Sequence, residues 1–328
     1  MFSVTSVVNN SLHHSVVLIA CLAGVLAWSA TAAGADDVPP PSAPPASNSA
    51  SALEAATARL NVSAASITEL PASPEGFARY RVNSSYQAGD TELRVLTPAG
   101  FDRGKRYRLL FVLPVEPGLE HRFGDGLPEV RRLDLHNKHQ LICVAPTFSA
   151  LPWYADHPTD PALRQETYFV DVVTPAVYQL YPIEPSPEHC LLLGFSKSGY
   201  GAWSLLLRHP DLYGRAAAWD APVDMDQPNR YGMQGVYGAQ ENFERYRLKT
   251  LLERRADLLK EDANRNRAPR LALFGYGNFR DQHIAIHERL VALNIPHEYR
   301  DGPKREHVWE SGWIAEAVEW LVSPSRRK

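Results

Sequence analysis

The sequence predicts an α/β fold with a doubly wound, mostly parallel sheet. Three short apolar runs, RLLFVLP, QLICVAP and CLLLG, are typical of strands that are covered on both faces. Between such runs lie segments whose apolar residues recur at helical spacing. An alternation of strands and helices along the chain indicates a parallel sheet with helices on both sides. With 45% hydrophobic and 22% charged residues, the chain can form a large core.

The first 33 residues are expected to be an export signal and not part of the fold. Residues 1–35 contain no Asp, Glu, Lys or Arg, and an apolar run at 15–29 leads into the sequence ATA at 30–32. This order is typical of a cleaved signal peptide, so we expect a periplasmic or secreted protein with no stable membrane partner. An uncleaved anchor is one alternative, because the run is nearly long enough to span a membrane. A lipoprotein signal is another, since LIAC at 18–21 resembles its processing box.

A linker is expected at 34–64, followed by one domain at 65–328. Residues 36–57 read DDVPPPSAPPASNSASALEAAT, a composition that cannot bury enough apolar surface to fold. The remaining length suits a single large domain.

The elements of this domain can be predicted in order. It should open with antiparallel strands at 77–85 and 91–98, which show alternating polarity. Parallel strands are expected at 108–114, 140–146, 190–194, 215–220, 270–275 and 297–300, and helices at 127–136, 162–181, 195–207, 282–293 and 314–321. Pro175 should kink the helix at 162–181.

Residues 221–268 are longer than a simple crossover requires. Their first half is rich in aromatic residues and glycine, and their second half contains an amphipathic helix, LKTLLERRADLLKE. Long loops in compact domains are usually functional or disordered, and the aromatic residues favour an ordered, cap-like loop. Tyr231, Tyr237 and Phe243 are therefore candidates for substrate binding, although they could equally pack the loop onto the domain.

The stretch LLLGFSKSGYGAW, residues 191–203, connects a predicted strand to a helix. A nucleophile at such a sharp turn needs small residues two positions before and two after it. Ser196 meets this condition with Gly194 and Ser198, whereas Ser198 would place Tyr200 in the crowded position. The pattern predicts that Ser196 is a nucleophile; the alternative is a structural turn in which Ser196 caps the helix.

A serine nucleophile requires a base, and the base requires an orienting acid. In chain order Ser–acid–His, the acid should follow a late strand and the histidine the last strand. Asp281 and His307 occupy these positions. Asp220 and Asp226, which follow an earlier strand, are the alternative acids.

The segment LLLGFSKSGYGAWSLLLRHPDLYGRAAAWD resembles the putative-esterase branch of the α/β-hydrolases. That branch includes S-formylglutathione hydrolases, feruloyl and acetylxylan esterases, enterochelin esterases and mycolyltransferases. TELRVLTPAGFDRGKRYRLLFVLP is similar to the opening strands of this branch, and the resemblance covers residues 75–322. It implies an α/β-hydrolase fold and a triad of Ser196, Asp281 and His307.

The sequence departs from this branch after RLLFVLP. The branch usually has a His-Gly pair there, whose backbone N–H groups help to form the oxyanion hole, whereas this chain reads PVEPG at 114–118. Pro114 has no N–H group to donate. The hole would therefore need the N–H of Lys197 together with that of Val115 or Glu116.

The strand order of the branch also implies that two cysteines are free. It places the strand at 108–114 between those carrying Cys143 and Cys190, roughly 9.5 Å apart at the usual strand spacing. A disulfide needs Cα atoms within about 7 Å, so we expect two buried thiols.

Neither a cofactor nor a nucleic-acid partner is expected. The net charge is −3, and Lys and Arg are scattered along the chain. His283 and His287 have the spacing of metal ligands on a helix, but Ile284 stands where a zinc protease has glutamate. We expect them on a solvated helix face, with no metal.

Together these features predict an exported serine hydrolase that cleaves small-molecule or carbohydrate esters of carboxylic acids. Aryl esters and acylated sugars are the candidate substrates. An acyltransferase with the same triad, a peptidase, and a binding protein that has lost catalysis remain as alternatives.

Overall fold

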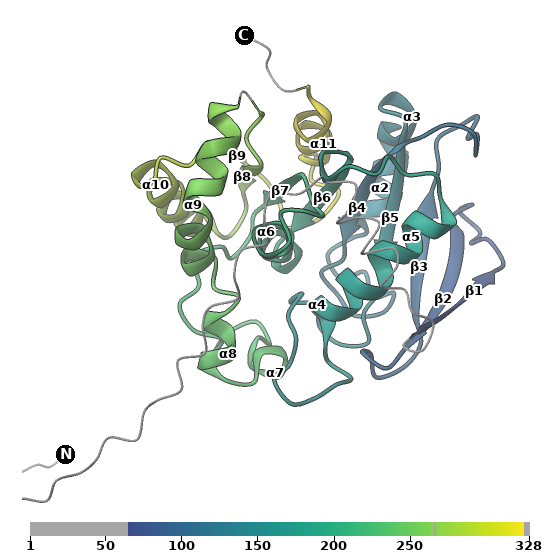
Figure 1. The fold of residues 1–328 in the computed structure, drawn as a ribbon, viewed down its shortest axis with the longest axis horizontal. Coiled ribbons are helices and arrows are strands. Elements are labelled where there is room, and N and C mark those ends of the chain that lie inside the picture. The colour runs from purple at the N-terminus through teal and green to yellow at the C-terminus, as the bar shows by residue number, and fades with distance from the viewer. Residues whose placement is uncertain (1–64, 266, 325–328) are drawn as a thin grey trace, which may run out of the picture. The chain divides into compact units, whose positions relative to one another are not determined.

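The computed structural model describes residues 65–265 and 267–324, so the predicted signal peptide and linker lie outside the described residues. One sheet of nine strands, in the order β1-β2-β3-β5-β4-β6-β7-β8-β9, forms the centre of the domain (Figure 1). The strands are β1 (Ala65–Leu70), β2 (Ala78–Ser84), β3 (Thr91–Leu96), β4 (Arg108–Leu113), β5 (Leu141–Pro146), β6 (Cys190–Phe195), β7 (Arg215–Trp219), β8 (Leu271–Tyr276) and β9 (His297–Lys304).

The sheet is antiparallel at its beginning and parallel over the remainder. The pairs β1–β2, β2–β3 and β3–β5 are antiparallel. The pairs β5–β4, β4–β6, β6–β7, β7–β8 and β8–β9 are parallel. The predicted fold class is therefore confirmed. Strand β1 was not predicted, because only its Ile67 and Leu70 are large apolar residues and none of its six residues is fully buried.

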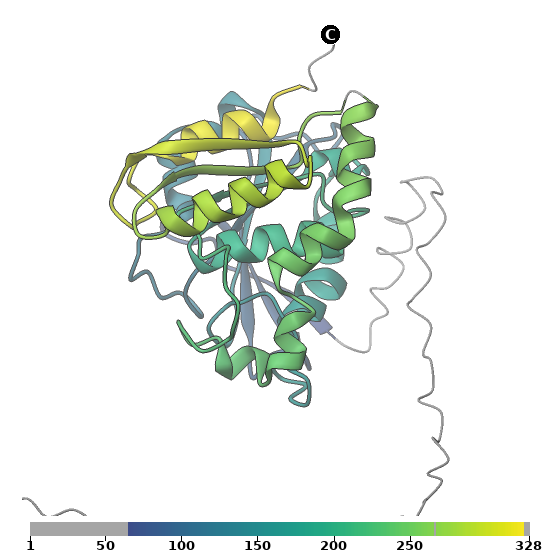
Figure 2. The same cartoon turned by 90° about the vertical axis from the view of Figure 1, so that its left-hand side faces the viewer.

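Helices cover both faces of the sheet, and each face has its own apolar core. On one face pack α4 (Gln165–Tyr168), α5 (Thr174–Leu180), α6 (Lys197–Arg208), α9 (Leu248–Asn264) and α10 (Arg280–Ala292). The opposite face is covered by α2 (Gly126–Arg132), α3 (Leu135–Lys138) and α11 (Ile314–Val322). Figure 2 shows this division at the β9 edge, where α10 and α11 lie on opposite sides of the sheet.

The predicted helix at 162–181 is interrupted. Between α4 and α5 the chain forms a π-helical turn, Phe169–Val173, and Pro175 lies in the first turn of α5. Because proline has no N–H, it cannot continue an α-helical ladder, which accounts for the change in helix type just before it. The predicted helix at 127–136 is also divided, into α2 and α3.

The cap-like segment after β7 is ordered. It contains α7 (Gln234–Tyr237) and α8 (Gln240–Glu244) before the long helix α9 (Figure 1). The two cysteines of the described domain, Cys143 and Cys190, are free and buried, as predicted. They lie on β5 and β6, which are separated by β4.

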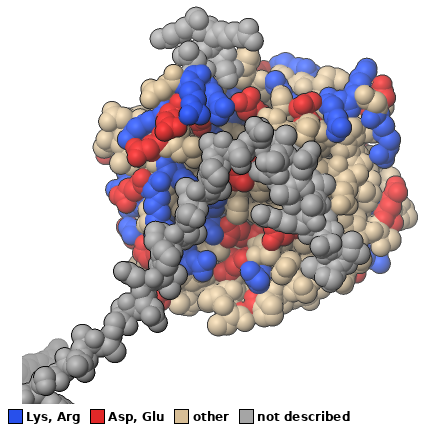
Figure 3. Space-filling view, in the orientation of Figure 1, with Lys and Arg blue, Asp and Glu red and all other residues tan. Residues whose placement is uncertain are grey.

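The surface of the domain carries mixed charge. On the face shown in Figure 3, Lys and Arg are interspersed with Asp and Glu. Within residues 65–265 and 267–324, no helix is long and apolar enough to cross a membrane.

Candidate active site

Ser196 lies on a sharp turn between β6 and α6. Its backbone has φ 52° and ψ −125°, a strained conformation for a residue with a side chain. The turn requires Gly194, because a Cβ atom there would overlap the backbone of Ser198. This confirms the predicted need for a small residue two positions before the serine.

Ser198 has a structural role in the same turn. Its hydroxyl donates to the carbonyl of Phe195 and accepts from the Phe195 N–H, both at 2.9 Å. Ser198 is fully buried, whereas Ser196 is 8% exposed. Of the two serines, only Ser196 is placed to meet a ligand.

His307 lies beside Ser196 in the loop that follows β9. Its Nε2 is 3.1 Å from the Oγ of Ser196. Its Nδ1 is 2.5 Å from Oδ2 of Asp220, which directly follows β7. Serine, imidazole and carboxylate therefore form one continuous hydrogen-bonded chain.

Asp220 is the acid of this chain, and the prediction of Asp281 is corrected. Asp281 is exposed in the first turn of α10. The turn before α10 directs backbone N–H groups toward Asp220 instead, with those of Asn278 and Phe279 at 2.8 Å from its carboxylate. Asp226, the other alternative, forms ion pairs with Arg247 and Lys249.

The surroundings of Asp220 keep it ionised. Its side chain is fully buried, and burial alone would raise its pKa. The hydrogen bonds from His307 and from the backbone at 277–279 outweigh burial and lower the pKa below its ordinary value. The carboxylate also lies at the N-terminal end of α10, where the helix dipole favours negative charge.

Aromatic rings surround the imidazole of His307. The ring of Phe195 lies 4.4 Å from it, between centroids, and those of Phe123 and Phe279 lie at 5.4 and 5.8 Å. Phe195 is buried, whereas Phe123 and Phe279 are partly exposed. Sequence reasoning missed both of the partly exposed rings, because neither belongs to a motif.

The three predicted substrate-binding residues have different positions. Tyr231 is 46% exposed, and its ring lies 5.7 Å from that of Phe279, next to the site. Tyr237 and Phe243 are fully buried and pack on each other at 5.2 Å. The prediction that Tyr237 and Phe243 contact substrate is therefore wrong, since they pack the loop onto the domain.

The predicted oxyanion residues come from two loops at the same end of the sheet. Lys197 begins α6, and Val115 and Glu116 follow β4. Within the described part of the chain, no hydrogen bond is made by the backbone N–H of any of these three residues. Their N–H groups are thus available to a ligand.

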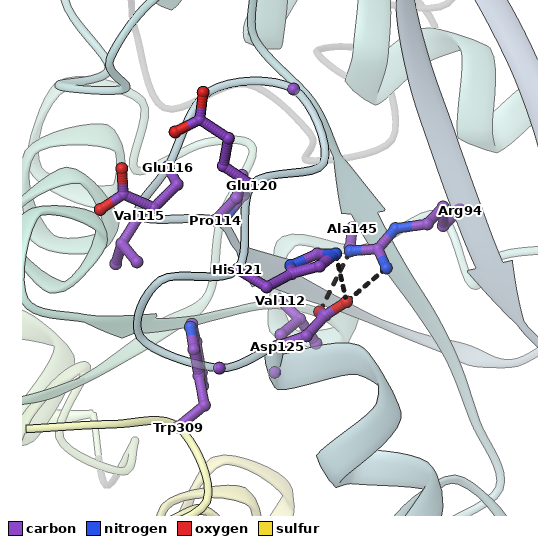
Figure 4. A pocket seen from close by; sticks show the side chains of 13 residues that line it. Arg94, Val112, Pro114, Val115, Glu116, Glu120, His121, Asp125, Ala145 and Trp309 are labelled. Atoms are coloured by element: carbon purple, nitrogen blue, oxygen red, sulfur yellow. Dashed lines mark hydrogen bonds and ion pairs between the residues drawn. The ribbon is translucent and has the colours of Figure 1, made fainter. Parts of the chain in front are cut away.

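A small pocket lies beside the loop that follows β4 (Figure 4). In this pocket Asp125 accepts two hydrogen bonds from Arg94, and its carboxylate lies 3.4 Å from Nε2 of His121. Val115 and Glu116 line the pocket, but Ser196 and His307 do not. The pocket therefore adjoins the predicted oxyanion residues without containing Ser196.

The spacing of His283 and His287 does not produce a metal site. His283 is buried, with Nε2 accepting from the Ala221 N–H at 2.9 Å, so the prediction of a solvated position is wrong for it. Nδ1 of His287 instead lies 2.7 Å from Nε2 of His297. Among the described residues, no group of three or more His, Cys, Asp or Glu could hold a metal ion.

No protein-family model matches the chain, and no curated protein is similar to it in sequence. Solved structures are similar to it in fold. An S-formylglutathione hydrolase from Agrobacterium tumefaciens has a TM-score of 0.61 at 14% identity, covering 79% of this chain and 99% of its own. An S-formylglutathione hydrolase from Staphylococcus aureus has a TM-score of 0.57 at 17% identity, and the match covers 79% of this chain and 100% of the hydrolase chain. A ferulic acid esterase has a TM-score of 0.57 at 18% identity, and the match covers 79% of this chain and 97% of the esterase chain.

These similarities agree with the mixed sheet and the covering helices of the domain. They extend over most of the described domain and nearly the whole of each compared chain. The chain therefore has the α/β-hydrolase fold, in the form found in S-formylglutathione hydrolases and ferulic acid esterases.

Proposed function

We propose that this protein is a serine hydrolase of carboxylic esters. The observation that carries the proposal is the continuous chain from Ser196 Oγ through His307 to Asp220, at 3.1 and 2.5 Å. Such a chain lets the imidazole take the serine proton while the carboxylate holds the ring in the required tautomer. The similarity in fold to known esterases supports the same reaction.

The reaction would proceed in two halves. Ser196 Oγ attacks the ester carbonyl as His307 Nε2 accepts its proton, and this proton then passes to the leaving alcohol. Water attacks the resulting acyl-enzyme with His307 again as the base, which releases the acid and restores Ser196. The backbone N–H of Lys197 and one N–H from Val115 or Glu116 would bind the negatively charged oxygen of each tetrahedral intermediate.

The residues beside His307 support a proposal for the substrate class. Phe123 and Phe279 present partly exposed rings beside the imidazole, and the exposed ring of Tyr231 lies against that of Phe279. Aromatic side chains bury large apolar area and stack on other rings, which favours an ester with an aryl or other apolar group. An acylated sugar would use the same rings through its apolar face.

We further propose that the protein is exported to the periplasm or secreted. The support for this is the apolar run and the ATA sequence at its N-terminus. N-terminal sequencing of the mature protein, recovered from the culture medium or periplasm, tests it; an intact residue 1 would contradict cleavage.

A fluorophosphonate probe and a panel of nitrophenyl esters test the enzymatic proposal. The wild type should be labelled on Ser196 and should hydrolyse esters, and Ser196→Ala should lose both properties while its melting temperature changes little. Absence of labelling in a correctly folded wild type would contradict the proposal and favour a binding protein. Addition of an alcohol or sugar acceptor distinguishes hydrolysis from acyl transfer by the ratio of products.

A further inference from the structure

The loop Pro114–Gly118 contains two backbone donors, Val115 and Glu116, for which no hydrogen bond is found among the described residues. Val115 and Glu116 are 3% and 8% exposed, yet neither N–H has a hydrogen-bond partner within the described residues. Buried backbone N–H groups are nearly always paired in folded proteins, because an unpaired one loses its hydrogen bonds to water. These donors can stabilise an oxyanion only if something fixes the direction in which they point.

Tyr154 fixes the first peptide of this loop. Its hydroxyl donates to the carbonyl oxygen of Pro114 at 2.8 Å. In a planar trans peptide the carbonyl and the following N–H point in opposite directions. A carbonyl that is held toward Tyr154 therefore turns the Val115 N–H to the opposite side.

Tyr154 is itself held rigidly. It is fully buried, its N–H donates to Oε1 of Gln165 at 3.0 Å, and its ring packs at 5.1 Å from that of Phe148. It also packs against Gly201 of α6 so closely that a Cβ atom on that glycine would overlap the ring. Because Tyr154 contacts both α6 and Pro114, it fixes the position of the loop relative to α6.

An ion pair connects the two halves of the predicted oxyanion hole. Nζ of Lys197 lies 3.5 Å from Oε1 of Glu116, and the two side chains are only 12% and 10% exposed. Burial lowers the pKa of Lys197, and the attraction of Glu116 opposes this effect. At the far end of the loop, the Gly118 N–H donates to the carbonyl of Phe148 at 2.8 Å.

We propose that Tyr154 and the ion pair between Lys197 and Glu116 are positioning residues, which hold the loop Pro114–Gly118 so that its backbone N–H completes the oxyanion hole. This inference rests on the proposed ester hydrolysis and deepens it. It also gives the side chain of Lys197 a role, in addition to that of its backbone N–H.

Conservative substitutions in the full-length protein test this proposal. Tyr154→Phe keeps the ring and removes only the hydroxyl, and Lys197→Met and Glu116→Gln each remove one charge while leaving the backbone donors in place. Tyr200→Phe is the matched control for the tyrosine, because its hydroxyl also donates to a backbone carbonyl, that of Tyr246, at 2.8 Å. Glu319→Gln is the control for the ion pair, since it breaks the exposed pair with Lys138.

Loss of one oxyanion donor typically lowers kcat about 100-fold to 1,000-fold, so partial misalignment should lower it about 10-fold to 100-fold. We expect this decrease for Tyr154→Phe, with KM nearly unchanged, and about 10-fold for each ion-pair variant. A boronic acid that forms a tetrahedral adduct on Ser196 should lose affinity in proportion to kcat/KM, whereas the carboxylic acid product should not. A purely structural role would change the melting temperature without separating these two affinities.

The outcomes distinguish a failure of the positioning role from a failure of the proposed function. Equal kcat and equal boronate affinity in Tyr154→Phe and Tyr200→Phe, with an active wild type, would overturn the positioning role alone. A folded wild type that hydrolyses no ester and is not labelled on Ser196 would overturn both the positioning role and the proposed function.

Discussion

Asp220 Oδ2 lies 2.5 Å from His307 Nδ1, so the carboxylate that contacts the imidazole directly follows β7, the strand next to β6, after which Ser196 lies. The carboxylate is held from two sides, by His307 and by the backbone N–H groups of Asn278 and Phe279. The loop after β8 thus contributes to the site through its main chain, whereas Asp281, in the first turn of α10, is exposed.

Replacing Asp220 should have a much larger effect than replacing Asp281. Asp220→Asn preserves the shape of the side chain but no longer holds the imidazole in the required tautomer, and comparable changes in serine hydrolases lower kcat about 10⁴-fold. Asp281→Asn alters an exposed side chain on α10 and should leave kcat within about twofold of the wild type. Steady-state kinetics on one nitrophenyl ester measures both; a strong loss in Asp281→Asn alone would contradict the assignment of Asp220.

The contrast between Asp220 and Asp281 shows what the sequence could and could not predict. The buried strands and the turn at Ser196 were predictable because they depend on local rules, namely apolar runs and the small residue required at Gly194. The choice between two acids depends on which loop approaches His307 in space, and both aspartates follow a parallel strand at the same edge of the sheet. Phe123 and Phe279, which each lie beside His307, come from segments more than 150 residues apart, so no local pattern could reveal their position.

Gly194 should be essential for the turn that presents Ser196. In Gly194→Ala the added Cβ would overlap the backbone of Ser198, which cannot move without displacing the start of α6. We expect loss of esterase activity together with a decrease in stability of about 2–4 kcal/mol, as for other strongly overpacked sites. Gly235→Ala in α7 is the control, because a Cβ there would meet nothing within 4 Å. Urea denaturation and nitrophenyl ester kinetics on both variants check this; equal stability of the two would show that the turn can relax.

Tyr231 and Tyr237, two of the tyrosines of the cap-like segment, should respond differently to truncation. Tyr231 is 46% exposed and its ring lies near Phe279, so Tyr231→Ala should lower kcat/KM for aryl esters by about 3-fold to 10-fold with little change in melting temperature. Tyr237 is fully buried, and Tyr237→Ala should destabilise the protein by about 3–5 kcal/mol.

The ratio of activity on aryl esters to activity on alkyl esters of the same acid, measured together with thermal melting, separates the two effects. A change of substrate preference in Tyr237→Ala at unchanged stability would show that Tyr237, too, contacts substrate. An unchanged preference in Tyr231→Ala would remove the exposed tyrosine from the substrate site.

His283 should make the stability of the protein sensitive to mild acid. It is buried, and burial lowers its pKa from 6.5 to about 4, although the negative charge of Asp220 opposes this. Because the folded state holds this histidine neutral, the unfolded chain binds one more proton between pH 6.5 and pH 4. Stability from this group is therefore fully present above pH 6.5 and is lost as the pH falls toward 4. One proton corresponds to about 1.4 kcal/mol per pH unit, so the loss over this range is about 3 kcal/mol.

His283→Gln removes the titrating group and retains an oxygen that can accept from the Ala221 N–H, the bond that holds the chain just after Asp220. The free energy of unfolding, measured in urea from pH 7 to pH 4, should therefore fall less steeply in this variant than in the wild type. If His283→Gln and the wild type lost stability in parallel, the acid sensitivity would have to come from other groups, and the buried histidine would not be the one that titrates.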